Sequence, residues 1–148
     1  MPKGLSPVQR TIRELNSQGI VCGIVERWIP YAKKPGFDGP PGVRKDLFDI
    51  IDIIALSERG VIGVQCCGSD FSSHIQKITI EKAQETYEWL RTPGTQMELW
   101  AWRKVKLERG GKAMRWRPRL AQFRLENGKI IYNEYQPEGI AKAESKLF

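Results

Sequence analysis

The apolar positions divide the first third of the chain into a helix, a strand and a loop. Ser6 and Pro7 are typical of an N-cap followed by proline at the first helical position. Apolar residues then recur at helical spacing, and we expect the helix to end before Gly19. Residues 20–28 are rich in Ile and Val and predict a strand. Residues 30–45 hold four prolines and three glycines, which predicts a long loop of a kind that is usually functional or mobile.

The middle of the chain predicts a hairpin of two buried strands followed by a helix. Residues 47–56 and 60–67 are nearly continuous apolar runs with a short polar turn between them, a pattern typical of strands buried on both faces. Residues 72–90 carry one approximate apolar stripe and predict a long helix, with Ser72 or Ser73 as its N-cap.

The last third predicts strands. Residues 97–105 alternate in polarity, and residues 115–125 and 129–135 read as a hairpin around the turn dipeptide Asn127-Gly128. The last ten residues, 139–148, are expected to fray. The order of helix, three strands, helix and three strands indicates an α/β fold with a mixed β-sheet flanked by helices.

The overall composition is that of an ordinary soluble globular protein. The chain has 148 residues, enough for a single domain, of which 41% are hydrophobic and 28% charged. No stretch approaches the length of a membrane span, and the N-terminus lacks the apolar core of a signal peptide. We therefore expect a cytoplasmic protein with no membrane partner.

The positive charge is concentrated in one segment. The net charge is +7, and residues 103–119 hold eight Lys and Arg residues against one acid, Glu108. Such a cluster favours an anionic partner, with nucleic acid first. Trp100, Trp102 and Trp116 interleave with these cations, which offers two alternatives: the rings stack on unpaired bases, or they are core residues, an alternative favoured for Trp100 and Trp102 because they share a strand face.

The cysteines and the histidine offer little chemistry of their own. The three cysteines, Cys22, Cys66 and Cys67, fit neither a disulfide framework nor a CxxC metal site, and we expect them to be reduced and buried. Cys67 lacks an adjacent base that would make it a nucleophile. His74 is the only histidine, so a histidine-based metal cluster or catalytic triad has little to draw on.

The predicted hairpin brings two polar residues together. If residues 58 and 59 form its tip, the strands pair residues whose numbers add up to 117, and Asp52 lies opposite Gln65. Because side chains alternate along a strand, Gln65 and Cys67 share a face that Asp52 can also occupy.

Aspartates inside an apolar strand are costly unless they are paired or bind a cation. Asp49 should point to the other face from Asp52, whereas Asp46 could return to the same side. Asp52 could simply be a capping or salt-bridged residue, paired with Arg44 or Lys45. The functional alternative is a divalent-metal site built from Asp52, the amide oxygen of Gln65 and the backbone carbonyl of Cys66, because Mg²⁺ prefers oxygen ligands.

The segment IIDIIALSERGVIGVQCC resembles the PD-(D/E)xK nuclease superfamily, and within it archaeal-type Holliday junction resolvases and related phage nucleases. In that pattern an aspartate on the second strand is followed about 13 residues later by E-x-K or Q-x-K, as Asp52 is followed by Gln65. The resemblance covers residues 6–106 and implies a restriction-endonuclease-like αβββαβ core, to which residues 107–136 would add a basic hairpin.

The chain departs from this pattern at two positions. Gln65 replaces the usual acid, and Cys67 replaces the lysine that activates the attacking water in the family. A thiol cannot replace an ammonium group, so Lys77 on the following helix is the candidate substitute. Glu14, on the first helix, and Glu26, at the end of the first strand, are candidates for a third metal ligand, as is Asp46.

The resemblance implies a metal-dependent DNA endonuclease that selects branched DNA, uses Mg²⁺ or Mn²⁺ and acts as a homodimer. The catalytic residues would be Asp52, Gln65, Cys67 and Lys77. The residues expected to bind DNA are Lys33, Lys34, Arg44, Lys45, Arg103, Lys104, Lys106, Arg115, Arg117 and Arg119. Two alternatives remain at this point: a catalytically inactive DNA-binding module on the same fold, and an interaction protein whose charge is incidental.

Overall fold

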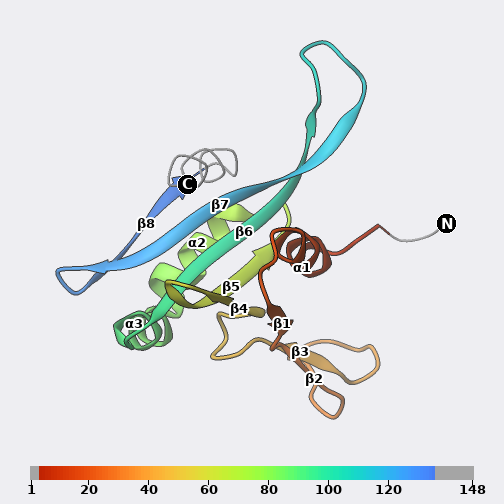
Figure 1. The fold of residues 1–148 in the computed structure, drawn as a ribbon. Coiled ribbons are helices and arrows are strands. Elements are labelled where there is room, and N and C mark those ends of the chain that lie inside the picture. The colour runs from red at the N-terminus through yellow and green to blue at the C-terminus, as the bar shows by residue number, and fades with distance from the viewer. Residues whose placement is uncertain (1–3, 136–148) are drawn as a thin grey trace.

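The computed structural model describes residues 4–135, which form a mixed sheet of six strands, a separate pair of strands and helices on both faces of the larger sheet (Figure 1). The predicted frayed tail, residues 139–148, lies outside the described residues. The helical elements are α1 (Pro7–Ser17), α2 (Phe71–Gln76), the π-helical segment η1 (Lys77–Glu81) and α3 (Ala83–Arg91). The strands are β1 (Cys22–Ile24), β2 (Arg27–Ile29), β3 (Val43–Lys45), β4 (Ile53–Ser57), β5 (Gly60–Cys67), β6 (Thr95–Lys106), β7 (Met114–Glu126) and β8 (Lys129–Tyr135).

The six-stranded sheet has the order β1-β4-β5-β6-β7-β8. All neighbours in it are antiparallel except β5 and β6, which run parallel because α2, η1 and α3 connect them as a crossover. β2 and β3 pair with each other in a separate two-stranded sheet. The structure is thus α/β with a mixed sheet, as the order of the elements predicts.

The first helix begins as its sequence predicts. Ser6 is the N-cap, its hydroxyl accepts from the backbone N–H of Gln9, and the Gln9 side chain accepts in return from the backbone N–H of Ser6. This capping box satisfies two N–H groups that a helix start otherwise leaves free. The helix ends at Ser17, before Gly19, which adopts a positive φ of 76°.

The two hairpins predicted from turn residues are both present. In the β4–β5 hairpin Ile53 pairs with Val64 and Ser57 with Gly60, so paired numbers add up to 117. In the β7–β8 hairpin Glu126 pairs with Lys129, and the two turn residues between them both have positive φ.

Three predicted elements are wrong in extent. The strand predicted over residues 20–28 is split into β1 and β2, because β1 pairs with β4 in the larger sheet whereas β2 pairs with β3 in the separate one. The strand predicted over 47–56 begins only at Ile53, since residues before it form a turn in which Phe48 and Asp49 have positive φ. The predicted loop 30–45 ends in a strand, β3.

The long helix predicted over residues 72–90 is interrupted. Its N-cap is Asp70 rather than a serine, and the π-helical segment η1 and Lys82 separate α2 from α3. The break frees the carbonyl of Ile78, and the buried hydroxyl of Thr86 donates to it at 2.8 Å. Side-chain bonding of this kind, which periodicity does not reveal, stabilises the interruption.

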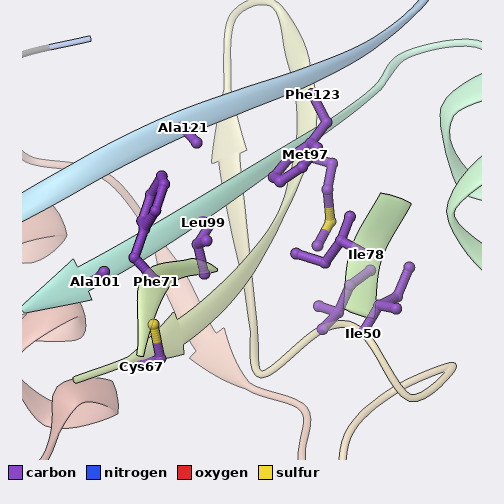
Figure 2. Packing of buried hydrophobic residues seen from close by; sticks show 10 residues of the cluster. Ile50, Cys67, Phe71, Ile78, Met97, Leu99, Ala101, Ala121 and Phe123 are labelled. Carbon is purple, nitrogen blue, oxygen red and sulfur yellow. The ribbon is translucent and has the colours of Figure 1, made fainter. Parts of the chain in front are cut away.

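The core has two layers, one on each face of the larger sheet. On one face α2, η1 and α3 cover Cys67, Met97, Leu99 and other residues of odd number in β5 and β6, which pack around Phe71 and Ile78 (Figure 2). On the other face α1 packs against residues of even number, including Trp100 and Trp102. No helix within residues 4–135 is long and apolar enough to cross a membrane.

The ends of β6 and β7 extend beyond the sheet as a long twisted hairpin (Figure 1). Their pairing continues to Lys106 and Met114, past the last residue of β5, which pairs with Ala101. We call residues 103–117 the arm.

Candidate functional site

Asp52 lies at the start of β4 and is 96% buried, with a relative exposure of 4%. Its Oδ2 accepts two hydrogen bonds, from Nε2 of Gln65 at 2.7 Å and from the backbone N–H of Cys66 at 2.8 Å. The register of the β4–β5 hairpin produces this contact, because it places residue 52 opposite residue 65 as the sequence predicts. Cys66 therefore contacts Asp52 through its backbone N–H group.

Two more carboxylates lie beside Asp52. Oxygen atoms of Glu26, Asp46 and Asp52 all lie within 4.8 Å of one another. Glu26 comes from the link between β1 and β2, and Asp46 directly follows β3. Of the three candidates for a third ligand, the structure therefore brings Glu26 and Asp46 to the site.

Glu14 lies elsewhere. It is half-buried on α1, and its carboxylate accepts a hydrogen bond from Gln18 at 3.1 Å. Since α1 packs against the opposite face of the sheet, the expectation that Glu14 is a metal ligand is wrong for this arrangement of the chain.

Lys77 reaches the carboxylate site from the junction of α2 and η1. Its Nζ donates to Oε1 of Gln65 at 3.1 Å and to Oδ2 of Asp46 at 3.5 Å. The same oxygen of Asp46 also accepts from Nε2 of Gln65 at 3.0 Å. Gln65 thus connects Lys77 to both aspartates, a contact that the sequence left open.

The two aspartates differ in their affinity for a proton. Burial, followed by the neighbouring Asp46, raises the pKa of Asp52 to about 8, against the opposing effect of the Cys66 N–H. Burial also acts to raise the pKa of Asp46, but hydrogen bonds from Asp52 and Gln65 and the charge of Lys77 outweigh it and lower that pKa. Asp52 therefore holds a proton more tightly than Asp46, because two carboxylates this close do not both ionise readily.

An open hollow lies beside the site and shares Asp46 and Lys77 with it. It is lined by Val43, Arg44, Lys45, Asp46, Asp49, Lys77 and Lys82. Three of its cations are engaged with acids: Arg44 lies 3.7 Å from Glu26, Lys77 lies 3.5 Å from Asp46, and Lys82 lies 3.4 Å from Asp49. The hollow thus presents both carboxylates and cations, a combination that suits a phosphate group approaching a bound cation.

Cys67 does not contact the carboxylates and instead points into the core beneath Phe71 and Leu99 (Figure 2). Burial, and then the neighbouring Asp70, raise the pKa of its thiol to about 12. The expectation of a catalytic role for Cys67 is therefore not supported, because neither a nucleophile nor a water-activating group works as a buried, protonated thiol.

Cys67 does have a histidine near it, contrary to the sequence-based expectation. Ligand atoms of Cys67, Asp70 and His74 lie within 4.8 Å of one another, and Nε2 of His74 lies 3.0 Å from Asp70. Among the described residues Nδ1 of His74 is buried without a hydrogen-bond partner. The sequence spacing does not predict that His74 lies near Cys67, because this proximity depends on the turn that precedes α2.

The cations expected to bind DNA fall in two places. Lys33, Lys34, Arg44 and Lys45 belong to the β2–β3 region beside the hollow, and Arg103, Lys104, Lys106, Arg115 and Arg117 belong to the arm. Arg119, at the base of the arm, is engaged within the chain: its guanidinium lies 3.8 Å from the centre of the Phe71 ring and 2.6 Å from Glu134.

The three tryptophans near the cations separate into two kinds. Trp100 and Trp102 are buried and pack against each other, and Nε1 of Trp102 donates to the hydroxyl of Thr11 at 2.9 Å. Their expected role in base stacking is therefore wrong, and the alternative of a shared core position is confirmed. Trp116 is 41% exposed, with the guanidinium of Arg10 3.9 Å from its ring centre.

Comparisons with protein families, with curated proteins and with solved structures find no match for this chain.

Proposed function

We propose that the chain is a metal-dependent endonuclease that hydrolyses phosphodiester bonds in DNA, with a preference for branched DNA, on a restriction-endonuclease-like core. One observation carries this proposal: Glu26, Asp46, Asp52, Gln65 and Lys77 come from five separate segments and converge on one place. A purely structural role would not require so many polar groups at the start of an apolar strand.

The donor set fits a hard divalent cation. Glu26, Asp46 and Asp52 offer carboxylate oxygens, and Gln65 offers an amide oxygen. Mg²⁺ and Mn²⁺ prefer such ligands. When bound, the ion polarises a phosphoryl oxygen and lowers the pKa of a water molecule.

In this proposal, separate residues of the chain bind the cation, stabilise the reacting phosphate and attract the flanking phosphates. The three carboxylates hold the ion and fix its position relative to the sheet. Lys77 supplies the positive charge that the family places at the position of Cys67, and it stabilises charge that develops on the phosphate. Arg44 and Lys45, on the rim of the hollow, attract the flanking phosphates. A two-fold dimer would present two such sites to two strands.

A second candidate function is a DNA-binding module that has lost its chemistry. One observation favours it: Nε2 of Gln65 donates to both Asp46 and Asp52, so hydrogen bonds within the chain satisfy the aspartates. A site with this network retains its shape whether or not it binds a cation.

Cleavage of a panel of DNA structures distinguishes the two functions. Wild type and Asp52→Asn are incubated with a four-way junction, a flap, a duplex and a single strand, each with Mg²⁺ or Mn²⁺. Cleavage by wild type that Asp52→Asn loses supports the endonuclease. Tight binding without cleavage in any metal supports the inactive module, and absence of both overturns the two proposals together.

A further inference from the structure

The arm has two chemically different faces. Its strands pair without a bulge from Met97–Phe123 to Lys106–Met114, so side chains alternate strictly between the two faces. Positions of odd number continue the face that carries α2, as the contact of Arg119 with Phe71 shows. Positions of even number continue the face that carries α1, as the contact of Arg10 with Trp116 shows.

Arginines gather on the odd face. Arg103 lies directly opposite Arg117, and Arg115 lies opposite Val105, one pair further out. We call Arg103, Arg115 and Arg117 the arginine row. Guanidinium groups suit phosphate especially, because they donate two parallel hydrogen bonds to it.

The arginine row lies on the same sheet face as the carboxylate site. Gln65 and Asp52 are opposite each other in the β4–β5 hairpin, and Gln65 pairs with Leu99, a residue of odd number in the adjacent strand β6. Arg103 follows Leu99 by four residues, which corresponds to about 13 Å along a strand. Because β5 and β6 are parallel, the arm leaves the sheet at the end where the carboxylates lie.

The even face differs in composition. It presents Lys104, Lys106, Met114 and Trp116, and the Trp116 ring lies between Arg10 and Lys104, whose Nζ is 5.3 Å from the ring centre. These groups face the α1 side of the sheet, away from the carboxylates. The lysine pair therefore provides a control that removes the same charge from the same arm, but from its other face.

We propose that the arginine row binds the phosphodiester backbone of a nucleic acid and leads it along the α2 face of the sheet to the carboxylate site. This inference rests on the proposed nuclease function for the direction of the path. The partner is a nucleic acid because the row lies about 13 Å along the same face from the carboxylates, and a phosphodiester backbone can reach from one to the other, where its phosphate is accepted together with a cation.

The test compares two double variants of the full chain, Arg103→Gln/Arg117→Gln and Lys104→Gln/Lys106→Gln. Binding of a fluorescent four-way junction and of a duplex is measured in EDTA over a series of salt concentrations. For the arginine pair we expect at least a tenfold loss of affinity and, for duplex, a decrease of about two in the slope of log K against log salt. For the lysine pair we expect less than a threefold loss.

Equal losses for the two pairs would overturn the proposal, because they would indicate net charge rather than a defined face. Binding of poly-glutamate in place of DNA would also overturn it. If the arginine double variant does not fold, Arg103→Gln is compared with Lys104→Gln in the same way. The assay needs no metal and no cleavage, so a failure of the nuclease chemistry and a failure of the row give separate results.

Discussion

The amide of Gln65 donates to Oδ2 of Asp52 at 2.7 Å across the β4–β5 hairpin. The same nitrogen donates to Asp46 and the amide oxygen accepts from Lys77, so this one side chain organises the site. An amide can present either a donor or an acceptor after rotation of its last bond, whereas a glutamate can only accept. Gln65 therefore suits a site that must be stable both without and with a cation.

Replacement of Gln65 by glutamate should make the site depend on metal. Gln65→Glu removes the donor to both aspartates and adds a negative charge at a position that is 1% exposed. We expect the free energy of unfolding in EDTA to fall by about 2 kcal/mol or more. We also expect Mn²⁺ to raise the melting temperature of this variant more than that of wild type, as measured by differential scanning fluorimetry.

Gln96→Glu is the matched control, since Gln96 donates to the backbone of Arg59 far from the site. If Gln65→Glu is as stable in EDTA as wild type, the assigned hydrogen bonds of Gln65 are wrong.

The stability of the metal-free chain should depend on pH through Asp52. Its pKa is about 8 in the folded chain, whereas an aspartate in an unfolded chain has a pKa of about 4. Between these values the folded chain binds more protons than the unfolded chain, so the free energy of unfolding falls as pH rises. The lowered pKa of Asp46 acts in the opposite sense, but only at more acidic pH.

Thermal unfolding of wild type and Asp52→Asn in EDTA measures this dependence. Asparagine cannot ionise, so we expect the melting temperature of the variant, relative to wild type, to be higher at pH 9 than at pH 5. A difference that stays constant or shrinks with rising pH would show that Asp52 is already ionised at neutral pH.

Lys77 should act on the reaction rather than on metal binding. Its ammonium donates to Gln65 and Asp46, and in the proposed mechanism it takes the role of the lysine in the nuclease pattern that the sequence resembles. We expect Lys77→Met to lower the rate of cleavage by about a hundredfold. Calorimetric titration should show Mn²⁺ affinity unchanged or increased, because a competing positive charge has been removed.

Lys82→Met tests whether any lysine at the rim has this effect, since Lys82 pairs with Asp49 at 3.4 Å. Equal loss of cleavage in the two variants, or loss of metal binding in Lys77→Met, would refute the separate role of Lys77.

Cys67 should be dispensable for cleavage. Its side chain is 4% exposed and packs in the core, so we expect Cys67→Ala to lower the free energy of unfolding by about 1 kcal/mol and to cleave at the wild-type rate. Cleavage rates of folded variant and wild type under reducing conditions check this. A folded Cys67→Ala protein without activity would indicate that the thiol takes part in the reaction.

The contact between Asp52 and Gln65 could be predicted from the sequence because a short turn fixes the register of a hairpin. The capping box at Ser6 and the turn at Asn127-Gly128 were predictable for the same reason: local chemistry determines them. The position of Asp46 was left open, since the turn that returns it depends on positive φ values at Phe48 and Asp49, which no strand pattern indicates.

The position of Lys77 could only be suggested. A continuous helix over residues 72–90 was the simplest reading of the periodicity, and the interruption at η1 depends on the buried hydrogen bond between Thr86 and Ile78. Likewise, polarity could not separate buried Trp102 from exposed Trp116. Trp102 is buried because α1 packs against it. Its contact residue on α1, Thr11, lies 91 residues earlier in the chain.

The most direct test of the central claim is the single-turnover cleavage of a four-way junction with Mn²⁺ by wild type, Asp52→Asn and Asp49→Asn. Asp49 also lines the hollow but pairs with Lys82, and asparagine tolerates its positive φ of 63°. The nuclease account predicts cleavage by wild type and Asp49→Asn, and a loss of at least a hundredfold in Asp52→Asn. Equal cleavage by all three proteins, or none by wild type, would contradict it.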